Sequence, residues 1–160
     1  MYKFCSHPTF LAAFGFALLT TSLSAISDDY DDHGNDSPVK CSNSSLKGTY
    51  AFYQYGEVIG QGPAADVGVL VADGKGAFSG SEIVHSPAGQ VVEITFCNGT
   101  YAVKENCMGD LRWIAEVGGK PCGEGVSIGP RTAAITISRK DVYVLSTTPG
   151  AVLVGIATKK

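Results

Sequence analysis

The stretch CSNSSLKGTYAFYQYGEVIG, residues 41–60, decides the fold that this chain can adopt. From residue 49 its side chains alternate between two faces, with Tyr50, Phe52 and Gln54 on one face and Thr49, Ala51, Tyr53 and Tyr55 on the other. An alternation with a period of two, rich in aromatic residues, indicates a β-strand. Glycines and a proline between residues 56 and 63 end this strand.

Short runs of the same kind continue to the end of the chain. We expect strands at residues 66–72, 76–85, 91–97, 100–103, 111–117, 132–138, 142–147 and 151–158. Asp73-Gly74 is typical of a hairpin turn, whereas residues 118–130, rich in glycine, are expected to be irregular. Asn98-Gly99 is either a type I′ turn or a glycine bulge inside one longer strand, which leaves the strand count open by one.

This order of strands, with no helix between them, predicts one all-β domain over residues 41–160. We expect a closed antiparallel up-and-down barrel of about eight strands, because closure removes the unpaired edges of a meander. The alternative is a β-sandwich, which needs long crossing connections that the sequence does not contain.

The composition supports a folded domain and excludes one class of partner. Hydrophobic residues make up 44% of the 160 residues and charged residues 17%, so the chain can form a core. The formal net charge is −3 and there is no basic patch, which argues against a nucleic acid as partner.

The first 25 residues have the features of a secretory signal peptide. Lys3 supplies the positive charge, residues 10–19 form the apolar segment, and Ser22-Leu23-Ser24-Ala25 is a small-residue cleavage site. They predict a secreted or periplasmic protein with no membrane partner after cleavage; the alternative is an uncleaved anchor helix, for which the apolar run is short. Residues 26–40 are acidic and poor in apolar side chains, so we expect a disordered linker.

Cleavage removes Cys5 and leaves four cysteines, Cys41, Cys97, Cys107 and Cys122. An even number of cysteines in a secreted chain predicts two disulfides, for which three pairings exist. We favour Cys41–Cys107 with Cys97–Cys122, because a hairpin turning near Glu105 would not place Cys97 opposite Cys107. The spacings fit neither a zinc site nor a redox motif, and we predict no metal and no cofactor.

Four segments resemble a family of small secreted bacterial proteins of uncharacterised function. They are LKGTYAF (46–52), GVLVADGKGAFSG (68–80), GTYAVKENCMG (99–109) and TTPGAVLVGIATKK (147–160). The resemblance covers most of residues 41–160 and implies a calycin-type barrel, similar to lipocalins, avidins and the allene oxide cyclase barrel. Gly48-Thr49-Tyr50 corresponds to the lipocalin G-x-W signature with Tyr in place of Trp, and Cys97 and Cys122 are additional to the family pattern, which is why they are paired together.

Aromatic side chains occur on most of the expected strands, and some of them must line the barrel interior. The candidate ligand-binding residues of this kind are Tyr50, Phe52, Phe96 and Trp113, around a cup for a small hydrophobic molecule. The simpler interpretation of the same residues is plain core packing, because a barrel of this size can fill itself.

Charges within the expected strands give two further candidates, Glu93 and Arg112. If the face of residues 111–117 opposite Trp113 lines the lumen, Arg112 and Glu93 or Glu82 form a buried charge pair suited to acid–base chemistry. If the Trp113 face packs inward, Arg112 and Glu116 are a solvated pair with no such role. No catalytic residue is assigned, since His85 stands alone at a strand end and no Ser-His-Asp arrangement follows from the spacing.

Three classes of function therefore stay open: a barrel that binds a small hydrophobic ligand, a structural or surface protein without a ligand, and a barrel isomerase or cyclase resembling allene oxide cyclase. The last two strands are apolar on both faces, which predicts that another subunit covers their outer side in a homo-oligomer.

Overall fold

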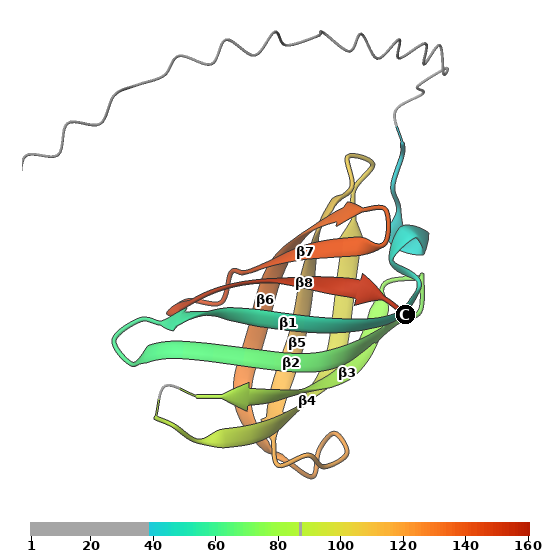
Figure 1. The fold of residues 1–160 in the computed structure, drawn as a ribbon. Helices are drawn as coiled ribbons and strands as arrows, with labels where there is room; N and C mark the ends of the chain where they lie inside the picture. Colours follow the sequence, from blue (N-terminus) through green and yellow to red (C-terminus); the bar gives the residue numbers. More distant parts are fainter. Residues whose placement is uncertain (1–38, 87) are drawn as a thin grey trace, which may run out of the picture. The chain divides into compact units, whose positions relative to one another are not determined.

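The computed structural model describes residues 39–86 and 88–160, so the predicted signal peptide and most of the predicted linker lie outside the described residues. The described elements are η1 (Asn43–Leu46), β1 (Gly48–Val58), β2 (Gly62–Ala72), β3 (Ala77–His85), β4 (Val91–Val103), β5 (Met108–Val117), β6 (Val126–Ser138), β7 (Asp141–Ser146) and β8 (Ala151–Lys159). They form a closed antiparallel barrel in which each strand pairs with the next and β8 returns to β1 (Figure 1). The predicted eight-stranded up-and-down barrel is thereby confirmed.

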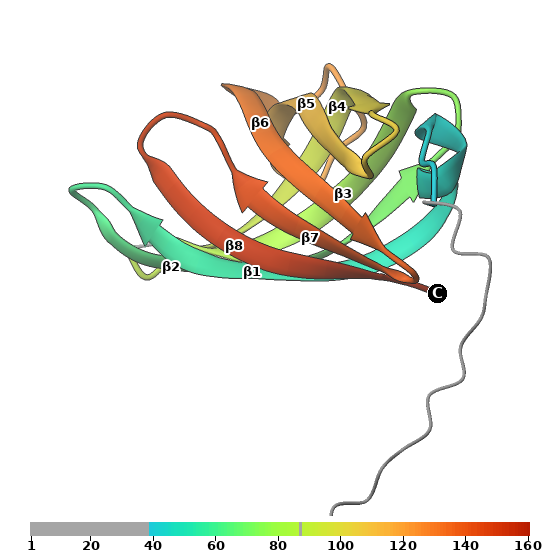
Figure 2. The same cartoon turned by 90° about the horizontal axis from the view of Figure 1, so that it is seen from above.

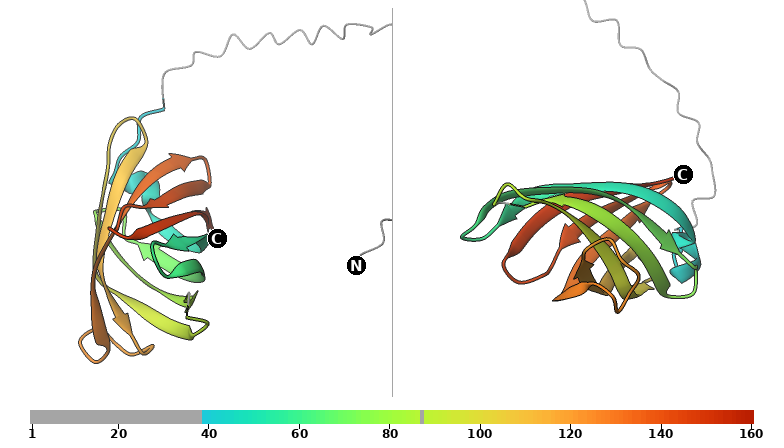
Figure 3. Two further views of the ribbon diagram at one scale, coloured as in Figure 1. Left: turned by 90° about the vertical axis from the view of Figure 1, so that its left-hand side faces the viewer. Right: turned by 90° about the horizontal axis from the view of Figure 1, so that it is seen from below.

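The quoted stretch supplies the strand on which the barrel closes. On one side β1 pairs with β2, so that Phe52 lies opposite Gly68 and Gln54 opposite Asp66. On the other side β1 pairs with β8, where Phe52 lies opposite Ala157. The views of Figure 3 show the sheet curving round until these two edges meet. Side chains from every second residue of each strand therefore meet in one lumen.

Asn98-Gly99 bulges one long strand and does not turn the chain. β4 runs through both residues, and its register with β5 shifts between Cys97 and Thr100. Asn98 takes a positive φ of 52°, which Asn tolerates better than most residues. The bulge keeps Phe96 and Tyr101, five positions apart in sequence, on the same buried face.

The expectation that residues 118–130 are irregular is wrong for their second half. β6 begins at Val126, and Pro130 lies within it, opposite Ile114. The register with β5 shifts between Ala115 and Glu116, and Gly129 on the facing strand has a φ of 98°. A bulge of this kind tolerates a proline inside a strand, which the local composition alone does not reveal.

One end of the barrel is covered by η1, which lies beside the start of β1 (Figure 2). Leu46, only 2% exposed, packs into the core from this short helix. The Asn43 side chain accepts a hydrogen bond from the backbone N–H of Val103 at 2.8 Å and donates one to the Lys75 carbonyl at 3.2 Å. The Tyr101 hydroxyl donates to the Asn43 carbonyl and accepts from the Gly74 N–H. These bonds hold η1 over the lumen.

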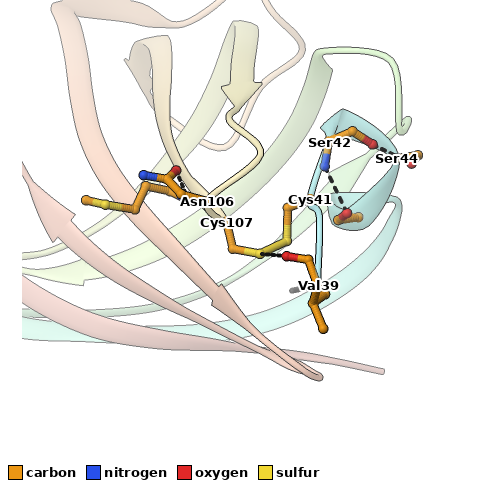
Figure 4. The surroundings of a disulfide bond; sticks show 8 residues. Val39, Cys41, Ser42, Ser44, Asn106 and Cys107 are labelled. Atoms are coloured by element: carbon orange, nitrogen blue, oxygen red, sulfur yellow. Dashed lines mark hydrogen bonds between the residues drawn. A yellow bond between two sulfur atoms is a disulfide. The ribbon is translucent and has the colours of Figure 1, made fainter. Parts of the chain in front are cut away.

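The structure contains both favoured disulfides, Cys41–Cys107 and Cys97–Cys122. Cys41–Cys107 joins the segment before η1 to the turn between β4 and β5 (Figure 4). The Cys41 backbone N–H also donates to the Glu105 carbonyl at 3.1 Å in that turn. The second disulfide ties β4 to the loop between β5 and β6. In the described ranges, no helix is long and apolar enough to cross a lipid bilayer.

The outer face of β2, β1, β8 and β7 exposes a continuous band of large apolar side chains: Tyr53, Tyr55, Val67, Tyr143, Leu145, Val152 and Val154. Register places Val67 opposite Tyr53, Tyr53 opposite Ile156, and Ile156 opposite Tyr143, so these side chains adjoin across four strands. Patches of this extent on a soluble domain often mark interaction surfaces. The homo-oligomer stays a prediction, and this band is the surface that it would use.

Light scattering of the purified protein at micromolar concentration is expected to give a mass of at least two chains. Tyr53→Lys, which adds a charge at the centre of the band, is expected to shift the protein to the monomer because the charge would be desolvated in the interface. Ser79→Lys, on the exposed face of β3 outside the band, serves as the control. A wild-type monomer would rule the prediction out.

Candidate functional site

The barrel lumen contains a cavity of about 40 Å³. Its wall is built from alternate residues of the strands: Phe52, Gln54, Leu70, Phe78, Glu82, Phe96, Leu111, Trp113, Ala133, Val144 and Ala157. Gln54 and Glu82 are the polar residues in this wall, and the others are apolar. The lumen is thus largely filled by its own side chains, with a small space left beside two polar groups.

Four aromatic rings form one side of the cavity. Phe96 is at their centre, with its ring centroid 6.0 Å from that of Phe52, 6.3 Å from that of Phe78 and 5.5 Å from that of Trp113. The rings of Phe78 and Trp113 meet edge to face at 6.1 Å. Tilted and edge-to-face pairs at these distances are favourable beyond the area that they bury. The cluster therefore presents a rigid aromatic wall.

Two glycines on neighbouring strands make room for these rings. A Cβ atom at Gly80 would lie 2.9 Å from the Phe96 ring, and a Cβ atom at Gly68 would collide with the Phe52 ring. Each ring thus lies directly over a glycine of the neighbouring strand. A larger residue in place of that glycine would collide with the ring.

Two carboxyl groups lie on the lumenal face of β2 and β3. Asp66 is opposite Gln54 on β1 and opposite Val84 on β3, so its side chain shares their face. Glu82 is opposite Gly68, two residues along β2 from Asp66. Such diagonal neighbours have their Cβ atoms about 7 Å apart. Asp66 is 5% exposed, and its Oδ1 atom has no hydrogen-bond partner among the described residues.

Burial makes both groups weak acids. It raises the pKa of Asp66 to about 7, although a hydrogen bond from the backbone of Gln54 opposes the rise. Burial likewise raises the pKa of Glu82 to about 8; the charge of Asp66 adds to this effect and that of Arg131 opposes it. Desolvation penalises the ionised form of a carboxyl group, which is the larger cause in both cases. At neutral pH the pair therefore carries less negative charge than two ordinary carboxylates.

Arg131 and Trp113 face the lumen from the opposite wall. They are opposite each other in the β5–β6 register, which puts both side chains on one face. The Trp113 Nε1 atom is buried and has no hydrogen-bond partner among the described residues. Among residues 39–86 and 88–160, the one ion pair within 4.0 Å joins Lys40 and Glu105. Arg131 therefore forms no ion pair with Glu82 or Asp66.

Of the four aromatic residues predicted from the sequence, three line the cavity: Phe52, Phe96 and Trp113. The fourth, Tyr50, is 2% exposed in the core but lies outside the cavity wall, towards η1. The interpretation in which the Trp113 face packs inward is the one that the structure shows.

Placing Glu93 and Arg112 in the lumen is wrong. Both side chains are exposed on the outer face of the barrel. Val92, Ile94 and Phe96 face inward on β4, and Leu111 and Trp113 on β5, so strand parity sends Glu93 and Arg112 outward. The lumenal charges are instead those of Asp66, Glu82 and Arg131, of which the sequence had suggested only Glu82. The predicted solvated ion pair between Arg112 and Glu116 is also absent at a cut-off of 4.0 Å. The Glu116 carboxylate instead accepts a hydrogen bond from the Gly123 N–H at 2.8 Å.

Searches of this chain against protein-family models, curated protein sequences and solved structures gave no match.

Proposed function

We propose that this protein binds a small molecule in the lumen of its barrel. An apolar, aromatic wall with a few polar groups is the usual composition of a ligand pocket. The volume of about 40 Å³ has room for roughly three water molecules, so a ligand with more than a few non-hydrogen atoms binds only when side chains of the wall move aside.

The observation that carries this proposal is a pair of buried polar atoms without a protein partner, Asp66 Oδ1 and Trp113 Nε1. Leaving a buried donor or acceptor unpaired costs about 1–3 kcal/mol, and an apolar residue at either position would avoid that cost. Trp113 lines the cavity and Asp66 lies opposite its wall residue Gln54, so a ligand that accepts from Trp113 or donates to Asp66 would satisfy one of the two atoms.

Secretion is part of the proposal. The two disulfides support it, because structural disulfides form and persist in secretory, periplasmic and extracellular compartments. The resemblance to calycin-type barrels belongs to the proposal in the same way, since the closed eight-stranded up-and-down topology agrees with it.

A second candidate function is acid–base catalysis of the isomerase or cyclase kind, which one specific observation favours. With its pKa raised to about 8, Glu82 keeps its proton at neutral pH and faces an apolar cavity. A carboxyl group in that state can donate a proton to a bound molecule. The candidate depends on the same cavity, so binding is the first property to test.

Trp113 is the one tryptophan of the chain, and its emission therefore reports on the cavity wall without a label. We expect at least one of 1-butanol, phenol and n-butylamine to change this emission in a saturable titration. Ala157→Leu adds three carbon atoms to the cavity wall and is expected to weaken that binding at least tenfold, because it occupies the space.

Ala51→Leu provides a matched control on β1, where the side chain is exposed on the outer face. It is expected to bind like the wild type, and circular dichroism verifies the fold of both variants. An equal response of Ala157→Leu and the wild type would place the binding outside the lumen and contradict the proposal.

A further inference from the structure

The lumenal cavity joins an acidic wall to an aromatic wall, and this combination selects a class of ligand. Phe52, Gly68 and Glu82 are consecutive partners across β1, β2 and β3. Because the Phe52 ring lies over Gly68, Glu82 approaches the aromatic cluster from the other side of that glycine. Both Phe52 and Glu82 line the cavity.

The two carboxyl groups have no cation of the chain in direct contact with them. Neither Asp66 nor Glu82 has an ion-pair partner within 4.0 Å in the part of the chain that the structure describes. Arg131, which faces them from β6, lowers the pKa of Glu82 from a distance but does not touch it. Gln54 on β1 is neutral. The carboxyl groups, when ionised, therefore leave one net negative charge in the lumen, which a single external cation would balance.

Aromatic faces attract the same kind of guest. A cation within about 6 Å of a ring centroid is stabilised by the ring's quadrupole, most strongly when it is shielded from water. The rings of Phe52, Phe78, Phe96 and Trp113 all lie at the cavity. An ammonium group that carries an apolar chain would meet the carboxyl groups with its charge and these rings with its carbon atoms.

The oxygen donors are too few for a hard metal ion. Calcium takes six to eight oxygen ligands and magnesium six, counting water. Asp66, Glu82 and Gln54 supply only two carboxyl groups and one amide, and the rest of the wall is apolar. The small cavity volume also excludes a large or branched amine.

We propose that the lumenal cavity binds a small organic ammonium ion, with Glu82 and Asp66 as its counter-ions and the aromatic rings as its apolar wall; this rests on the proposed ligand-binding function. Glu82 lies in the cavity wall and accepts a hydrogen bond from the ammonium group, whereas Asp66 lies outside the wall on the same face and acts through its charge.

Binding of such an ion is coupled to proton release. Burial keeps both carboxyl groups protonated to higher pH than usual, and the groups that face them are Gln54, which does not titrate, and Arg131. An alkylammonium ion is charged throughout pH 6 to 9, as lysine is. The affinity for this ion therefore rises with pH. Below the pKa of a carboxyl group that must lose its proton for binding, the rise is about tenfold per pH unit.

The test compares n-butylamine with 1-butanol, which has the same chain and no charge. At pH 8.5, titrations followed by Trp113 emission are expected to give a dissociation constant for n-butylamine at least tenfold below that for 1-butanol. At pH 6.5 the n-butylamine constant is expected to rise at least tenfold, while that of 1-butanol stays the same. Glu82→Gln is expected to abolish the preference for the amine and to keep the binding of 1-butanol, which shows that the variant is folded.

Glu93→Gln is the matched control, because Glu93 is an exposed glutamate on the outer face of β4. It is expected to retain the full preference. Equal binding of the two probes by the wild type, or a preference that survives in Glu82→Gln, would overturn the ammonium proposal and leave the lumenal site intact. If neither probe nor phenol changes the Trp113 emission, and two-dimensional NMR shows no shift of lumenal residues, both proposals fail together.

Discussion

The double variant Asp66→Asn/Glu82→Gln is expected to be more stable than the wild type at pH 9, by several kcal/mol in the free energy of unfolding. The pKa of Asp66 rises from 3.8 in the unfolded chain to about 7 in the barrel, and that of Glu82 from 4.5 to about 8. Between these values the folded protein binds more protons than the unfolded chain. The contribution of the pair to stability is therefore complete below about pH 4 and is lost as the pH rises through 7 and 8.

Urea denaturation followed by circular dichroism at pH 5, 7 and 9 measures this dependence. The wild type is expected to lose stability continuously from pH 5 to 9, whereas the double variant shows a nearly flat profile because its amides do not titrate. Glu93→Gln, on the exposed outer face, is expected to follow the wild type. A wild-type stability that stays level or increases over this range would show that the carboxyl groups are not buried as the barrel requires.

Removing the disulfide at the covered end, in Cys41→Ser/Cys107→Ser, is expected to lower the free energy of unfolding by about 4 kcal/mol. The sequence separation of these cysteines is 66 residues, and closing so long a loop restricts the unfolded chain strongly. The bond also holds the segment before η1 in place, so that Leu46 stays in the core and Asn43 keeps its bonds to Val103 and Lys75. A loss of this size is a large fraction of the stability of an ordinary domain.

The second disulfide provides an internal comparison. Cys97–Cys122 spans 25 residues, so Cys97→Ser/Cys122→Ser is expected to cost about 3.5 kcal/mol through the unfolded state. Urea midpoints of the two double variants, each measured with the remaining disulfide intact, give the order directly. If Cys41→Ser/Cys107→Ser unfolds at the wild-type midpoint, the bond and the η1 cover contribute nothing to the barrel.

Strand parity made most of the fold and the aromatic half of the site accessible from the sequence. The alternation in residues 49–55 placed Tyr50 and Phe52 on one face of β1, whereas the run from Leu111 to Val117 left open which of its two faces is lumenal. The glycine and proline punctuation between runs predicted the number of strands to within one, and the meander of strands predicted the closed barrel. The bulge at Asn98-Gly99 could not be settled in this way, because a turn and a bulge use the same two residues.

The acidic half of the site was not predicted from the sequence, and the reason is physical. On β2 the β-branched residues Val67 and Val71 are exposed, whereas Asp66 and Gly68 face the lumen, which reverses the usual order of apolar inside and polar outside. The signal that could have found Asp66 is the hairpin register. A turn centred on Gly60 pairs residue 66 with residue 54, which lies on the same face as Phe52. Arg131 was not predicted because the strand that contains it was expected to begin one residue later, at residue 132.

Native mass spectrometry of the protein, purified from its own host, tests the lumenal binding site most directly. The account predicts a population that carries the added mass of one small molecule, which is absent from Ala157→Leu and retained in Ala51→Leu. Protein that shows only the mass of the bare chain in several independent preparations would contradict it.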